Sequence, residues 1–156
     1  MKNVIGILCV VLLLFQSYEV NAAESDTQKA VLITGATTGI GRVAAEHLAA
    51  NGYFVYAGAR KASDMEELNK IENIQAVRLD VTIQEEIDAA VEHIQSEGRG
   101  LWGLVNNAGV NVVGPLIEFD DEDFDFLFDV NVKGVFSVTK ACAPLIIESQ
   151  GRIVNI

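Results

Sequence analysis

A glycine-rich turn between an apolar run and a helical stretch constrains the fold of this chain more than any other feature. The turn reads TGATTGIG over residues 34–41 and directly follows the apolar residues 30–33. Glycines at a strand-to-helix junction let backbone N–H groups and the positive end of the helix approach a phosphate without an intervening Cβ. The spacing is G-x-x-x-G-x-G, which differs from the commonest G-x-G-x-x-G pattern. The turn predicts either a pyrophosphate site or a tight turn with close strand packing.

Short apolar runs alternate with helical periodicities along the rest of the chain, which predicts an α/β fold built from strand and helix units around a parallel sheet. We expect strands at 30–34, 53–58, 76–79, 101–106 and 152–156, and helices at 40–50, 64–71, 83–97 and 121–148. We expect the last helix to be shorter than these limits, with Pro144 as the site of a bend. About five such strands form a doubly wound sheet that binds its ligands at the carboxyl ends of the strands.

Composition excludes several classes of protein. The chain is 50% hydrophobic, so it is neither disordered nor fibrous, and its net charge of −11 argues against binding to nucleic acid or anionic lipid surfaces. The acidic run 118–125 is either a metal site or the solvated start of a helix. The second interpretation is favoured because no His or Cys is interleaved, and we predict no metal site. Cys142 is alone after the leader, so a processed chain has no internal disulfide.

The first 22 residues have the plan of a signal peptide. Lys2 precedes an unbroken apolar run of 12 residues, Val4 to Phe15, which is shorter than the roughly 18 residues of a membrane-spanning helix. Small residues favour cleavage after Ala22 or Ala23, and residues 23–29 form a short polar spacer before the domain at 30–156. The leader predicts export to the secretory pathway or periplasm. The alternative is a retained N-terminal anchor at a membrane.

Four motifs occur in one order between residues 34 and 131. After TGATTGIG come LDVT at 79–82, NNAG at 106–109 and Asn131 within DVNV at 129–132. This set resembles the short-chain dehydrogenase/reductase family, and the resemblance covers nearly everything after the leader. It implies a Rossmann-like domain and an NAD(P)-dependent oxidoreductase that transfers a hydride between nicotinamide and a small alcohol or carbonyl substrate. The implied cofactor-binding residues are Gly35, Thr37, Thr38, Gly39, Ile40, Gly41, Arg60, Asp80, Val81, Asn107, Ala108 and Gly109.

The end of the second expected strand bears on the choice of cofactor. An acidic residue there would bind the ribose 2′-OH of NAD, whereas an arginine can hold the 2′-phosphate of NADP. The strand ends in Arg60 and Lys61, and no acidic residue follows until Asp64. This favours NADP(H) over NAD(H), although both cations would also suit a solvated loop.

The resemblance implies a catalytic Ser, a Tyr-x-x-x-Lys pair and a helix asparagine. Only Asn131 is present, where it either positions a water in a proton relay or satisfies a helix kink. Tyr53 and Tyr56 have no lysine four residues on, and the chain ends just before the position of the Ser, so we expect an N-terminal fragment. Phe124, Phe128, Val132 and Val135 form an apolar seam typical of core or of subunit contact. The resemblance implies that the full-length protein is a homo-oligomer, because the matching helix of the family packs against its partner in a dimer.

Three functions remain open at this point. The first is an oxidoreductase present in part, and the second is a non-catalytic module that binds a nucleotide or a partner. The third is a non-functional product that aggregates because it cannot cover its sheet. The substrate cannot be assigned from these residues.

Overall fold

The computed structural model describes residues 28–156. Residues 1–27, which include the predicted leader and most of the predicted spacer, lie outside the described residues. The sheet has five parallel strands in the order β3-β2-β1-β4-β5. They are β1 (Ala30–Ile33), β2 (Phe54–Ala59), β3 (Ile74–Arg78), β4 (Gly103–Asn106) and β5 (Arg152–Asn155). The strand order reverses between β1 and β4, which confirms the predicted doubly wound, Rossmann-like fold.

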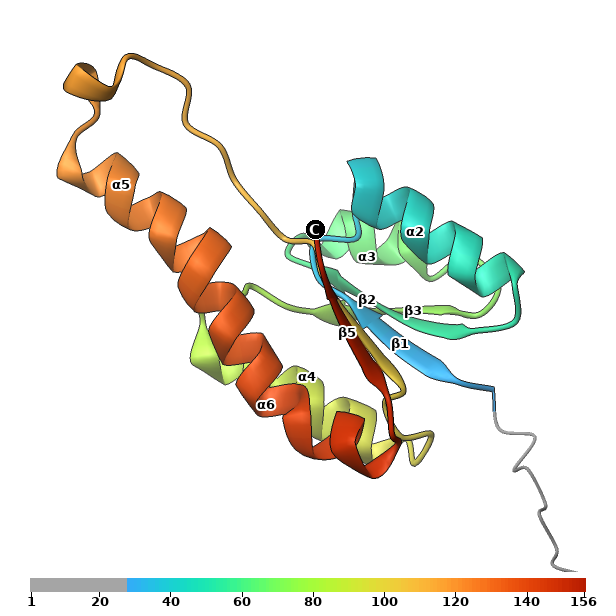
Figure 1. Cartoon of the computed structure of the whole chain (residues 1–156). Helices are drawn as coiled ribbons and strands as arrows, with labels where there is room; N and C mark the ends of the chain where they lie inside the picture. Colours follow the sequence, from blue (N-terminus) through green and yellow to red (C-terminus); the bar gives the residue numbers. More distant parts are fainter. Residues whose placement is uncertain (1–27) are drawn as a thin grey trace, which may run out of the picture.

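Helices cover both faces of the sheet (Figure 1). On one face lie α2 (Gly39–Ala50) and α3 (Ala62–Leu68), and on the other lie α4 (Gln84–Ser96) and α6 (Val135–Glu148). Alternate residues of β1 enter the two cores: Leu32 packs on the α4 and α6 side, and Val31 and Ile33 pack on the α2 side. Because β1 is buried on both faces, it has no polar side, and its sequence is a continuous apolar run.

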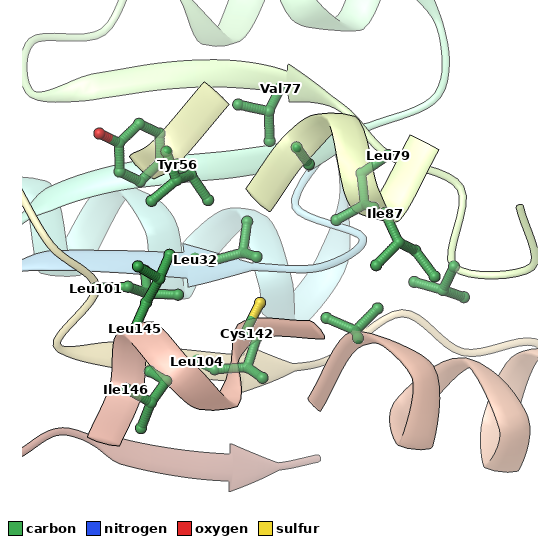
Figure 2. Packing of buried hydrophobic residues seen from close by; sticks show 14 of the residues in the cluster. Leu32, Tyr56, Val77, Leu79, Ile87, Leu101, Leu104, Cys142, Leu145 and Ile146 are labelled. Carbon is green, nitrogen blue, oxygen red and sulfur yellow. The ribbon is translucent and has the colours of Figure 1, made fainter. Parts of the chain in front are cut away.

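The core on the α4 and α6 side contains the larger side chains (Figure 2). Leu32 and Tyr56 of the sheet meet Ile87 of α4 and Cys142 and Leu145 of α6. Each fully buried aliphatic side chain contributes about 1.5–3 kcal/mol to folding. Burial also raises the pKa of the Cys142 thiol to about 12, so this cysteine is a neutral packing residue.

The helix that follows the long segment 107–120 is continuous from Asp121 to Glu148. It consists of α5 (Asp121–Phe128), a π-helical segment η2 (Asp129–Gly134) and α6. The expected shortening is therefore wrong, and the departure from α-helical geometry lies at η2 rather than at Pro144. Gly134 is the reason for the close approach there, because a Cβ at this position would lie 2.7 Å from Cγ2 of Val81. By length and composition alone this helix could cross a membrane, but α6 buries Val138 and Leu145 against the sheet.

The apolar seam of this helix faces outward rather than into the core. Phe124, Phe128 and Val132 are 50–53% exposed, and Val135 is partly buried. The start of α5 is acidic because it is a helix N-terminus: the Asp120 carboxylate caps it by accepting a hydrogen bond from the Asp123 N–H at 2.8 Å. Within residues 28–156, no group of three or more His, Cys, Asp or Glu is placed to hold a metal ion.

Candidate functional site

A cavity of about 310 Å³ lies at the carboxyl ends of the central strands, at the lower end of the size range of ligand pockets. The turn after β1, the ends of β2 and β3, the segment after β4 and the π segment all contribute to its wall. Nine of the predicted cofactor-binding residues line it: Gly35, Thr37, Thr38, Ile40, Arg60, Val81, Asn107, Ala108 and Gly109. The other lining residues are Gly58, Ala59, Leu79, Val110 and Val130, none of which was predicted.

The glycines of the turn have different tasks. Gly35 has a positive φ of 63°, and a Cβ on it would lie 2.8 Å from the Ala108 Cα, so only glycine lets these two backbones meet. Gly39 has a φ of 57° and begins α2. A Cβ at Gly41 would overlap the Asn107 side chain and the Gly35 carbonyl. Gly39 therefore sets the backbone conformation of the turn and Gly41 its packing, and neither residue lines the cavity.

Thr34 and Asn107 join the turn to the segment after β4. The Thr34 hydroxyl accepts hydrogen bonds from the N–H groups of Asn107, at 3.0 Å, and Ala108, at 2.9 Å. In return the Asn107 side-chain amide donates to the carbonyls of Thr34 and Gly35, both at 3.0 Å. Thr34 is almost fully buried. Sequence reasoning gave it no role, but a polar residue that ends a buried strand just before a glycine is a recognisable signal.

Asn106 extends the same network away from the cavity. Its side-chain amide donates to the Thr139 hydroxyl on α6 at 3.0 Å and to the Asn155 side-chain oxygen on β5 at 2.9 Å. These two bonds tie β4 to the helix that covers it and to the neighbouring strand. The end of β4 is therefore held from three directions.

Asn131 lies in the π segment, beside the cavity rather than in its wall. Its side chain forms two hydrogen bonds with the main chain of Val110, accepting from the N–H and donating to the carbonyl, each at 2.9 Å. The preceding residue, Val130, lines the cavity. The segment after β4 is thus fixed on one side by Thr34 and on the other by Asn131.

Arg60 and Asp80 stand at the ends of β2 and β3. Nη1 of Arg60 lies 3.7 Å from Oδ2 of Asp80, and Arg60 is 64% exposed at its side chain. The Asp80 carboxylate also accepts hydrogen bonds from the Thr82 N–H, at 3.0 Å, and hydroxyl, at 2.7 Å. Partial burial acts to raise the pKa of Asp80, but the Thr82 hydrogen bonds and the Arg60 charge outweigh it and hold the pKa below its usual value.

Neither tyrosine of the described residues reaches the cavity. Tyr53 precedes β2 and packs near the ring of Trp102, with ring centroids 5.8 Å apart. Tyr56 points into the core from β2, and burial and the Glu97 charge raise the pKa of its hydroxyl. Both are packing residues, Tyr53 beside Trp102 and Tyr56 in the core on the α4 and α6 side.

Comparison with known proteins agrees with this geometry. Residues 29–156 match the family model described as short chain dehydrogenase. The chain is 39% identical over 132 residues to a 3-amino-tetrahydro-pyrrolizinone reductase of Xenorhabdus hominickii, with 83% of this chain and 46% of the relative covered. It is 43% identical over 138 residues to the mitochondrial D-beta-hydroxybutyrate dehydrogenase of Bos taurus, with 82% and 40% covered. The chain therefore spans less than half the length of these two relatives.

Solved structures show the same relationship. An alcohol dehydrogenase from the archaeon Thermococcus sibiricus, complexed with 5-hydroxy-NADP, is 27% identical with a TM-score of 0.77, covering 82% of this chain and 57% of that one. A serine dehydrogenase from Escherichia coli is 31% identical with a TM-score of 0.75, covering 81% and 60%. The fold, the order of the motifs and these matches lead to one conclusion: the chain belongs to the short-chain dehydrogenase family.

Proposed function

We propose that the cavity binds NADP(H), and that the whole protein is an oxidoreductase acting on an alcohol or carbonyl compound. The observation that carries this proposal is the position of the cavity at the switch point of the sheet, walled by the glycine-rich turn and by residues 107–110. Ligands of doubly wound sheets bind at this point. When bound, the reduced cofactor would donate a hydride to a carbonyl compound, and the oxidised cofactor would accept one from an alcohol.

The residues of the wall fit a dinucleotide. Gly35 leaves room for a close approach to the backbone, and Thr37 and Thr38 add hydroxyl groups at the start of α2, where the positive helix end favours a pyrophosphate. Val81 and Val110 give apolar surface for flat rings. Arg60 places a cation at the end of β2, where a 2′-phosphate would lie.

Hydride transfer to a carbonyl also needs a proton donor, because an alkoxide develops on the substrate oxygen. Within the described residues the cavity wall contains no Tyr, Lys or Ser. We assign the Ser, Tyr and Lys of the family to the region of the whole protein that corresponds to the remaining length of its relatives. The role proposed for Asn131 is to hold Val110, and with it the part of the cavity wall that Val110 forms.

The preference for NADP(H) is tested by titrating the chain with NADPH and NADH and following the nicotinamide fluorescence. We expect NADPH to bind more tightly, and Arg60→Ala to weaken NADPH binding by about 10-fold or more, the worth of one charge-assisted hydrogen bond, while NADH binding is unchanged. Lys61→Ala is the matched control, because Lys61 is the adjacent cation but precedes α3 outside the cavity wall. Equal affinity for the two cofactors would contradict the NADP(H) preference, and no binding of either would contradict the proposed function.

A second candidate function is nucleotide binding without hydride transfer. It is favoured by the side chain of Asn131, whose amide oxygen and nitrogen are both engaged by Val110, and by the burial of Tyr56 away from the cavity. The two functions differ in one measurement: oxidation of bound NADPH in the presence of a panel of ketones and aldehydes. Turnover by the whole protein supports the oxidoreductase, and binding without turnover supports the second function.

We also propose that the whole protein is a homo-oligomer joined through the seam of Phe124, Phe128 and Val132. They form a row of exposed apolar side chains along one helix. Single exposed apolar residues are normal on a protein surface, whereas a contiguous row marks an interaction site. Light scattering of the protein and of Phe128→Glu tests this proposal. A change from oligomer to monomer in the variant supports it, and an unchanged mass contradicts it.

For location, we propose that the apolar leader directs export or anchors the protein to a membrane. The support is the charged start and the short apolar run at residues 2–15. Fractionation of expressing cells, with the N-terminus of the recovered protein sequenced, separates the two outcomes. Cleavage near Ala22 indicates a signal peptide, an intact leader in the membrane fraction indicates an anchor, and an intact soluble protein contradicts both.

A further inference from the structure

One ion pair outside the cavity contacts the backbone of both Arg60 and Asp80. Nε of Arg78, at the end of β3, lies 2.9 Å from Oε1 of Glu86 in the first turn of α4. The Arg78 guanidinium also donates a hydrogen bond to the carbonyl oxygen of Arg60. The Glu86 carboxylate accepts one from the N–H of Asp80 through its other oxygen, at 2.7 Å. Neither Arg78 nor Glu86 lines the cavity.

The two residues held in this way are Arg60, which lines the cavity, and Asp80, its ion-pair partner, which does not. Arg60 follows β2 directly and Asp80 lies two residues after β3, both beyond the last strand pairing at Ala59 and Arg78. The last ladder bond runs from the Leu79 N–H to the Ala59 carbonyl oxygen at 2.9 Å, and beyond it the sheet does not join the two chains. The backbone bonds of Arg78 and Glu86 replace it, because each closes one end of a bridge from Arg60 to Asp80.

Charge and burial support this arrangement. The Glu86 side chain is only 20% exposed, so its carboxylate is protected from solvent on the side that meets Arg78 and Asp80. Both its oxygens are engaged, one by each partner. An ion pair with this many fixed hydrogen bonds holds its geometry better than an isolated surface pair.

We propose that Arg78 and Glu86 are positioning residues that set the preference for a 2′-phosphate, by holding Arg60 and Asp80 at a fixed separation. This inference rests on the proposed binding of NADP(H). A 2′-phosphate needs the Arg60 guanidinium in one place, and a misplaced positioning group loses part of the binding energy that it would supply. Ligands without a 2′-phosphate do not depend on Arg60, so their binding free energy should not change.

The test compares two small ligands of the full chain, 2′,5′-ADP and 5′-AMP, by calorimetric titration. We measure Arg78→Met, Glu86→Ala and the double variant, with thermal unfolding recorded for each. We expect the ratio of the two affinities to fall about three- to tenfold in either single variant, the worth of one hydrogen bond, and no further in the double variant, because the two residues act as one unit. Glu67→Ala, which breaks the exposed Lys70–Glu67 pair beyond the cavity, is the matched control and should leave the ratio unchanged.

Three outcomes would overturn the inference alone. An unchanged ratio in the variants means that the pair has no positioning role, and an equal loss for both ligands together with a lower melting temperature means a structural role only. Tighter binding of 2′,5′-ADP to Glu86→Ala means that a released Arg78 contacts the phosphate itself. If Glu86→Ala does not fold, Glu86→Gln is measured instead, since it keeps an oxygen for the Asp80 N–H and loses the charge. Failure of the unaltered chain to bind either ligand would overturn the proposed function as well, which separates the two failures.

Discussion

The side chain of Asn131 binds the main chain of Val110 through two hydrogen bonds, accepting one from its N–H and donating one to its carbonyl oxygen, each at 2.9 Å. Asn131 belongs to the π segment and Val110 to the segment after β4, 21 residues earlier. Val110 and Val130 both line the cavity. The asparagine thus fixes the separation of two parts of the cavity wall that the sheet does not connect.

Replacement of Asn131 by Ala should release the segment after Val110. Both hydrogen bonds are lost, so we expect the free energy of unfolding to fall by about 1–2 kcal/mol, and the Val110 amide to exchange its hydrogen faster. Urea denaturation and hydrogen exchange measure the two effects. Asn111→Ala, an exposed neighbour in the same segment, is the control and should change neither quantity. Unaltered exchange at Val110 in Asn131→Ala would show that other contacts hold this segment.

Thr34→Val should be more costly than its small change in shape suggests. The valine has the same size but cannot accept the hydrogen bonds from the N–H groups of Asn107 and Ala108, which would be left buried without that partner. Each unsatisfied group costs about 1–3 kcal/mol, so we expect a loss of roughly 2–4 kcal/mol in urea denaturation. Thr34→Ser keeps the hydroxyl and should lose under half of that. A loss in Thr34→Val no larger than that in Thr34→Ser would contradict the role of the hydroxyl, because the serine keeps it and the valine does not.

Gly41→Ala should damage the turn by displacing Asn107. A Cβ at position 41 would overlap the Asn107 side-chain nitrogen and would lie 2.5 Å from the Gly35 carbonyl oxygen. Overpacking of this kind costs about 1–3 kcal/mol, and we expect weaker NADPH binding because the turn must move. Gly114→Ala is the control, since its nearest neighbour would be 3.6 Å away in ordinary contact. NADPH affinity equal to that of the unaltered chain would show that the turn accommodates the methyl group.

Much of the fold is predictable because each strand and helix has its own periodicity. The boundaries that sequence reasoning misplaced depend on contacts between elements. The third strand begins at Ile74 instead of residue 76, because Asn73 adopts a positive φ of 63° and Ile74 then pairs with Val55. The π segment arises where Gly134 packs on Val81, and no local pattern in residues 129–134 announces that contact.

The site shows the same division. Thr37 and Asn107 could be predicted because they lie in the TGATTGIG and NNAG motifs, which resemble those of the short-chain dehydrogenase family. Leu79, Val110 and Val130 were missed because an apolar residue in the wall of a cavity has the same sequence signal as one in the core. Arg78 and Glu86 were not singled out, because their contacts with Arg60 and Asp80 are with backbone atoms, which one sequence does not identify.

Asp80 should make the stability of the chain depend on pH in the acidic range. Its pKa is held below the usual value in the folded state, so the folded chain binds a proton on this carboxylate less readily than the unfolded chain does. The stability that Asp80 contributes is therefore fully present above the ordinary pKa of about 3.9 and is lost as the pH falls through the lowered value.

The difference in unfolding free energy between the unaltered chain and Asp80→Asn, measured in urea at intervals from about pH 7 down to about pH 3, should shrink toward the acidic end. Asp125→Asn, an exposed carboxylate on α5, is run over the same range to account for the general effect of removing one negative charge. A difference for Asp80→Asn that stays constant with pH would mean that Thr82 and Arg60 bind the protonated carboxyl as well as the charged one.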